Sequence, residues 1–161
     1  MSVACKHPTK KMFWVSFSYS GTGTLNSIEG MMDSETYKAL LGQHLVTELD
    51  EVQAEGTAIF QQDSAPCHVS KTRMKYFRDN NITFLDWPGN SPVLNPNENL
   101  WAICKDRLQK MDCTTKTKLV EAVIQVWFRD EAITNNCKKL VDSMPRRVQE
   151  VIKVKGGHIP Y

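Results

Sequence analysis

The alternation of apolar and polar positions predicts two strands near the start of the chain. Residues 12–21, MFWVSFSYSG, alternate apolar with small or hydroxyl residues and are rich in β-formers, so we predict a strand that ends at Gly21. The next segment, TGTLNSIEG, predicts a turn and a shorter second strand, as in a hairpin. Two later apolar runs, TAIFQQD and ITFLDWP, have the length of short buried strands.

Apolar residues at helical spacing predict helices between and after these strands. Asp33 is a candidate N-cap for a helix that runs to about residue 49, and a second helix spans Ser70 to Asn80. From Asn95 onward the pattern is helical. Breaks in this last part are expected at Cys113–Thr115, Asn135–Asn136 and Pro145. Strands that alternate with helices and then give way to them indicate an α/β fold, with helices packed on a sheet.

Length and composition limit the class of protein. The chain has 161 residues, enough for one domain, with 41% hydrophobic and 24% charged residues, as in ordinary globular proteins. Its five cysteines contain no C-x-x-C pair, which argues for reduced thiols and against a disulfide scaffold or a zinc site. No apolar run suits a secretory signal or a bilayer span. We therefore expect an intracellular protein without membrane contact.

Charge is distributed unevenly along the chain. The net charge is +2, but residues 98–161 carry 12 basic against 8 acidic residues. A basic C-terminal part is compatible with a polyanionic partner. Solvated helix faces explain the same excess equally well.

Asp63 ends the apolar strand AIFQQ and is followed by a turn. Ligand sites in open α/β sheets form where strands end, and an acid at a strand's last position avoids the cost of burying a charge. The sequence Asp-Ser-Ala-Pro also suits an Asx-turn or an N-cap. Taken alone, the turn explains Asp63 better than a binding site does.

Glu98 lies where the proline-rich stretch WPGNSPVLNPNENLW becomes helical. Asn95 can be the N-cap, Pro96 the first helical residue and Glu98 the third, which makes a variant of the capping box. Glu98 also shares a helix face with Lys105, so that the two could face a metal and a phosphate together. The two interpretations are compatible, because a capped first turn also holds a ligand in place.

Together these stretches resemble a known family. QQDSAPCH and WPGNSPVLNPNENLW, with 34 residues between Asp63 and Glu98, are similar to the catalytic core of the mariner superfamily of Tc-like DDE transposases. That core has an acid in a "QDNAPxH"-like motif and a glutamate in a "WPxxSPDLNPIENLW"-like motif. The resemblance covers essentially the whole chain, from the strand MFWVSFSYSGTG to the closing KGGH…Y.

The resemblance implies a ribonuclease-H-like mixed sheet with flanking helices, and metal-dependent cleavage and transfer of DNA strands. In such proteins three carboxylates hold two Mg²⁺ or Mn²⁺ ions. By position, Asp63 resembles the second acid and Glu98 the third, so both are expected to be catalytic residues and metal ligands. Lys105 and Arg107 are expected to contact DNA phosphates. The implied partners are transposon ends and target DNA, in the nucleus, with no small-molecule substrate.

The departures from the family lead to further expectations. The family's first aspartate lies upstream of the segment that KMFWVSFSYSG resembles, so we expect residues 1–161 to form a single partial catalytic domain, truncated at the N-terminus. Its opening strand and the helix-turn-helix region would be missing, and cleavage would be impaired. Val93 replaces the usual aspartate of Ser-Pro-Asp, and Asn97 an aliphatic residue. Without the opening strand, MFWVSFSY becomes an apolar edge, so we predict a homodimer or aggregation through it.

Three hypotheses about function stay open. The first is a transposase catalytic domain with impaired catalysis. The second is a domesticated, non-catalytic module that binds DNA or a protein through its basic C-terminal helices. The third is an active nuclease that is completed by another acid, such as Asp86, or by a longer gene product.

Overall fold

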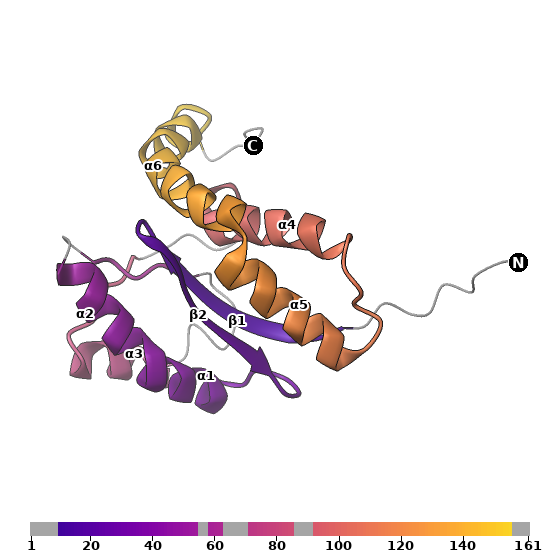
Figure 1. Cartoon of the computed structure of the whole chain (residues 1–161). Helices are drawn as coiled ribbons and strands as arrows, with labels where there is room; N and C mark the ends of the chain where they lie inside the picture. The colour runs from indigo at the N-terminus through magenta and orange to yellow at the C-terminus, as the bar shows by residue number, and fades with distance from the viewer. Residues whose placement is uncertain (1–9, 55–57, 63–70, 86–91, 156–161) are drawn as a thin grey trace, which may run out of the picture. The chain divides into compact units, whose positions relative to one another are not determined.

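The computed structural model describes residues 10–54, 58–62, 71–85 and 92–155 (Figure 1). The chain folds as two compact units. The first takes its described residues from Met1–Gly30 and Asn97–Asp142, and the second from Met31–Pro96 and Ser143–Tyr161.

A β-hairpin opens the first unit, as the alternating pattern predicts, but its first strand ends at Ser18 instead of Gly21, and its second strand is not the shorter one. Strand β1 (Met12–Ser18) pairs antiparallel with β2 (Gly21–Ile28). The register shifts between Val15 and Phe17, where β2 contains one more residue than β1, which is a β-bulge. Among the described residues β1 has β2 as its strand partner, and self-association through its other edge stays a prediction.

Three helices complete the first unit: α4 (Pro96–Leu108), α5 (Lys116–Arg129) and the first part of α6 (Glu131–Lys153). Helix α5 lies along the hairpin and packs on β2 (Figure 1). Trp127 has no exposed surface, and its indole N–H donates to the carbonyl of Gly23 in the bulge, at 3.2 Å. The core of this unit is formed by buried side chains from α4, α5 and α6: Leu100, Cys104, Val126, Trp127, Ile133, Cys137 and Leu140.

The cysteines of this core are unsuited to chemistry. Burial raises the pKa of the thiols of Cys104 and Cys137 to about 11. A thiol becomes a nucleophile or a metal ligand only as a thiolate, so both side chains act as small apolar groups. Both thiols are free.

Asp112 organises the turn between α4 and α5. Its carboxylate accepts hydrogen bonds from the Thr114 N–H at 3.1 Å and the Thr114 hydroxyl at 2.7 Å, and it pairs with Lys118. Above all the hydrogen bond from Lys118, and then those from Thr114, lower the pKa of this exposed carboxyl from 3.8 to about 2. Thr115, the N-cap of α5, accepts the Lys118 N–H. The predicted break at Cys113–Thr115 is therefore confirmed.

Asp112→Asn is expected to lower the melting temperature at neutral pH and to have little effect in acid. A carboxyl with a lower pKa when folded contributes stability above its unfolded pKa, near 3.8, and loses it as the pH falls through about 2. The gap between variant and unsubstituted protein should thus be widest at pH 7 and close toward pH 2, measured by circular-dichroism melts. Asp142→Asn, exposed on α6, is the matched control. A gap that stays constant down to pH 2 would contradict the assignment.

A long helix dominates the second unit. It runs without a break through α1 (Ser34–Leu40), a π-helical stretch η1 (Leu41–Leu45) and α2 (Val46–Ala54). Asp33 is its N-cap and accepts the Thr36 N–H at 2.8 Å, which confirms the predicted start. The helix ends about one turn later than predicted.

Among the described residues, the second unit also contains α3 (Lys71–Asp79), a 3₁₀ turn η3 (Pro92–Leu94) and the end of α6. Phe77 of α3 is buried and contacts the rings of Phe60 at 5.6 Å and Phe84 at 5.2 Å between centroids. The two predicted strands TAIFQQD and ITFLDWP are represented, in their described residues, by a single parallel bridge between Phe60 and Phe84. Their last residues lie outside the described part of the chain.

Two predicted helix breaks are wrong. Asn135–Asn136 and Pro145 all lie inside α6. The break comes at Asp130, whose carboxylate accepts the Ala132 N–H at 2.8 Å and so caps α6. The Asn136 side chain donates to the Ala132 carbonyl one turn earlier, which accommodates a poor helix former within the helix. No helix in the described ranges has both the length and the apolarity needed to cross a bilayer.

Candidate functional site

Glu98 is the third residue of α4, as predicted. The helix begins at Pro96, so Asn95 occupies the N-cap position. The side chain of Glu98 is exposed, and so is that of Lys105 further along the helix. Leu100 and Cys104 bury the opposite side in the core. The acid is therefore held on a rigid helical turn with its oxygens accessible, as a metal ligand requires.

Asp63 lies outside the described residues, and so does Asp86, the alternative acid. The residues just before Asp63 are described. The side-chain N–H of Gln61 donates to the carbonyl of Leu94 at 2.9 Å, and the buried Tyr37 hydroxyl donates to the side chain of Gln62. The chain that leads into Asp63 is thus bonded to the turn that leads into α4.

The turn before α4 has a second anchor. Arg147 of α6 is only 3% exposed, and its Nη1 donates to the carbonyl of Val93 at 2.9 Å. Its Nε donates to the hydroxyl of Ser143, one turn earlier on the same helix, at 2.8 Å. Neither Gln61 nor Arg147 is marked by the local sequence pattern, because their partners lie 33 and 54 residues away along the chain.

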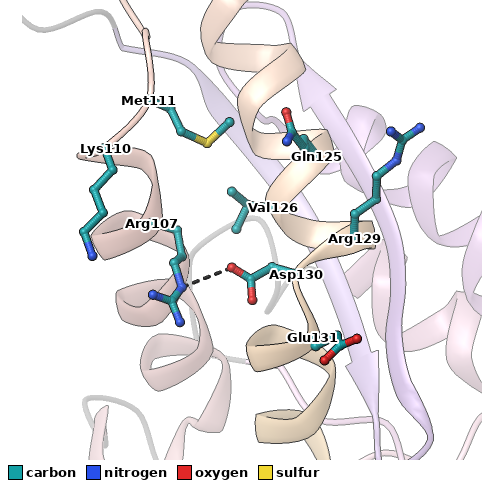
Figure 2. Close-up of a pocket in the computed structure, with 8 residues that line it drawn as sticks. All are labelled: Arg107, Lys110, Met111, Gln125, Val126, Arg129, Asp130 and Glu131. Atoms are coloured by element: carbon teal, nitrogen blue, oxygen red, sulfur yellow. Dashed lines mark ion pairs between the residues drawn. The ribbon is translucent and has the colours of Figure 1, made fainter.

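Arg107 lies beside a hollow in the first unit (Figure 2). Its Nε is 3.0 Å from a carboxylate oxygen of Asp130, and the side chains are 39% and 25% exposed. The hollow has a volume of about 450 Å³. Figure 2 shows the ion pair between α4 and the α5–α6 junction, with Lys110 and Arg129 on either side. The residues that line the hollow are Arg107, Lys110, Met111, Gln125, Val126, Arg129, Asp130 and Glu131.

The basic side chains beside this hollow differ in whether an acid pairs with them. Arg107, predicted to contact phosphate, is engaged by Asp130. Lys110 and Arg129 are exposed and have no ion pair within the described part of the chain. The prediction omitted both. The basic excess of the C-terminal part was the available signal, but it cannot tell cations that face one hollow from those on other helix faces.

The described residues hold no group of three His, Cys, Asp or Glu side chains that could bind a metal. The acid donors proposed from the sequence are Asp63 and Glu98. Magnesium and manganese prefer octahedral coordination by oxygen and take only a few of these ligands from protein carboxylates, and the exposed carboxylate of Glu98 is a donor of that kind. The chemistry of this donor therefore fits a hard divalent cation.

The chain is similar to transposases over most of its length. It is 32% identical over 151 residues to the transposable element Tcb2 transposase of Caenorhabditis briggsae, across 93% of this chain and 54% of the relative. It is 33% identical over 152 residues to the transposable element Tc3 transposase of Caenorhabditis elegans, across 93% of this chain and 45% of the relative. The chain thus spans about half the length of these relatives.

Solved structures share the fold. The catalytic domain of Mos1 mariner transposase superposes with a TM-score of 0.82 at 18% identity, over 98% of this chain and 80% of that one. A structure of this domain with Raltegravir and Mg superposes with a TM-score of 0.80 at 17% sequence identity, over 93% of this chain and 77% of that one. The transposase in a Mos1 paired-end complex with the left transposon end superposes with a TM-score of 0.83 at 17% sequence identity, over 99% of this chain and 49% of that one.

These likenesses confirm the fold and family expected from the two motifs. The fold is α/β and ribonuclease-H-like, as in the Mos1 catalytic domain. A family model described as DDE superfamily endonuclease matches residues 7–120, which include both Asp63 and Glu98. The chain belongs to the DDE superfamily of endonucleases, and it is similar in sequence to the Tc transposases and in fold to the Mos1 catalytic domain.

Proposed function

We propose that this chain is the metal-binding part of a DNA-cleaving transposase, in which Asp63 and Glu98 are two carboxylate ligands of Mg²⁺ or Mn²⁺. The hydrogen bond from the Gln61 side chain to the Leu94 carbonyl carries the proposal, because Gln61 lies two residues before Asp63 and Leu94 lies four residues before Glu98. The Mos1 catalytic domain with Mg supports divalent metal use in this fold.

The residues would have simple roles. Each acid would supply oxygen ligands to the cation, and the exposed Glu98 and Lys105 of α4 would face a cation and a phosphate together. When bound, such ions activate water or a 3′-hydroxyl and stabilise the leaving oxygen of an in-line displacement. Asp63 and Glu98 would be two of the three carboxylates that the family resemblance implies. We therefore expect weak metal binding and little strand cleavage by these residues alone.

The test is Mn²⁺ binding, measured by the electron paramagnetic resonance signal of free Mn²⁺ in a titration of the intact chain. Binding that both Asp63→Asn and Glu98→Gln weaken supports the shared site. Binding that neither variant alters, or no binding at millimolar Mn²⁺, would overturn it.

A second function, metal-independent DNA binding, is favoured by the cations beside the hollow. We propose that the exposed Lys105, Lys110 and Arg129 contact phosphates, with Arg107 contributing the nitrogens that its pair with Asp130 does not use. The Mos1 complex with a transposon end supports DNA as the partner of this fold. Both functions are compatible with one DNA-cleaving protein.

Lys110→Gln and Arg129→Gln are each expected to lower the salt dependence of duplex binding. Each lost phosphate contact reduces the slope of log K against log salt by about 0.9. Fluorescence anisotropy across a salt series, with chelator present, measures this slope. Lys139→Gln, also exposed but away from the lining of the hollow, is the charge-matched control and should have the smaller effect. Equal slopes for all three variants would contradict a localised phosphate surface.

A further inference from the structure

Arg147 stands out among the described residues because it is a charged side chain with only 3% of its surface exposed. Burying a guanidinium is costly unless its donors are hydrogen-bonded in the interior. Two of these donors have defined acceptors, the Ser143 hydroxyl at 2.8 Å and the Val93 carbonyl at 2.9 Å. The bond to Ser143, one helical turn earlier, orients the guanidinium toward Val93.

The turn that Arg147 holds is bonded at two successive carbonyls. Within η3, Val93 accepts from Arg147 on α6, and Leu94 accepts from Gln61 at 2.9 Å. Leu94 is itself 5% exposed, so its position is also fixed by packing. A turn that is bonded from two different elements has little freedom to shift, because moving it would leave buried polar groups unpaired.

The η3 turn lies directly before the helix that carries Glu98. Helix α4 begins at Pro96, directly after the turn and Asn95, and Glu98 lies in its first turn. Gln61 is likewise two residues before Asp63. The two hydrogen bonds therefore restrain the turn that leads into the helix carrying Glu98. Metal ligands and reacting groups need such restraint, since displacements of about 1 Å reduce binding and catalysis strongly.

We propose that Arg147 and Gln61 are positioning residues, which clamp the η3 turn and thereby hold Glu98 where a divalent cation can bind. This inference rests on the proposed metal function. Neither side chain touches the metal or the DNA in this proposal. Both act through the backbone carbonyls of Val93 and Leu94.

The test compares adjacent arginines of α6. Arg147→Met fills similar space without donors, whereas Arg146→Met removes an exposed guanidinium that pairs with Glu150 at 3.5 Å. We expect Arg147→Met to speed hydrogen–deuterium exchange in the first turn of α4 by roughly tenfold or more, with α5 unchanged. Mn²⁺ affinity should fall at the same time. Arg146→Met should alter neither measurement.

Three further variants test whether Arg147 and Gln61 act on the same turn. Gln61→Leu should produce the same local exchange, and its combination with Arg147→Met should be non-additive because both hold one turn. Arg147→Lys should rescue in part, since one ammonium cannot reproduce the fixed geometry of the guanidinium. If Arg147→Met does not fold, Gln61→Leu and Arg147→Lys give the same comparison.

The two proposals fail in different ways. Exchange that rises equally in α4 and α5 would show general destabilisation and overturn the clamp, whatever the metal result. Absence of Mn²⁺ binding in the unsubstituted chain would remove the metal function, while the exchange measurement would still decide whether the turn is clamped.

Discussion

Glu98→Gln is expected to weaken Mn²⁺ binding roughly tenfold or more while leaving the fold intact. Loss of groups that merely orient metal ligands already costs about 10–100-fold in affinity, so loss of a ligand should cost at least as much. Glutamine keeps the size of the side chain, and Glu98 is exposed, so the melting temperature should change little. The titration that measures free Mn²⁺ gives the affinity, and circular dichroism gives the melting temperature.

Asp106→Asn is the matched control for this change. Asp106 is an exposed acid on the same helix, and its substitution removes the same unit of charge. A general loss of negative potential would weaken Mn²⁺ binding equally in both variants, whereas direct coordination affects Glu98→Gln alone. Equal effects would therefore show that Glu98 is no ligand.

Trp127→Ala is expected to destabilise the first unit by about 3–5 kcal/mol, which is a large part of the stability of most domains. The side chain has no exposed surface, packs edge-on against Trp101 at 6.3 Å, and donates to Gly23 in the bulge of β2. Its removal would separate α5 from both α4 and the hairpin. Urea denaturation followed by far-ultraviolet circular dichroism measures the change.

Two related variants separate the causes. Phe128→Ala removes the neighbouring aromatic residue, which is 52% exposed, and should cost less than about 1 kcal/mol. Trp127→Phe keeps most of the packing and loses the hydrogen bond to Gly23, so it should cost an intermediate amount, near 1–2 kcal/mol. Similar losses for Trp127→Ala and Phe128→Ala would show that the hairpin and α5 are held together elsewhere.

Local chemistry made some parts of the fold predictable. The alternation in MFWVSFSYSG predicted β1, and Asp33 predicted the start of α1, because both depend on residues within a few positions of each other. The start of α4 followed from Asn95 and Pro96 in the same way. The two motifs also identified the family, since their sequences, rich in proline and asparagine, are far more specific than a pair of acids.

The sequence pattern did not predict helix boundaries and ion pairs that depend on tertiary packing or on a distant residue. Asn135–Asn136 and Pro145 have poor helix propensity, yet α6 continues through them, since the packing of its apolar face outweighs propensity. The boundary moved to Asp130, which caps α6 and pairs with Arg107 of α4. That pair also determined that Lys110 and Arg129, rather than Arg107, are the cations without an ion pair beside the hollow within the described residues.

The sequence by itself determined the family, the starts of the principal helices and the two acids proposed as ligands, because short-range patterns and motif spelling carry that information. Only the tertiary structure decided what restrains the turn before Glu98. Gln61 and Arg147 reach it from 33 and 54 residues away, and a hydrogen bond between a side chain and a distant carbonyl leaves no periodic trace in the chain.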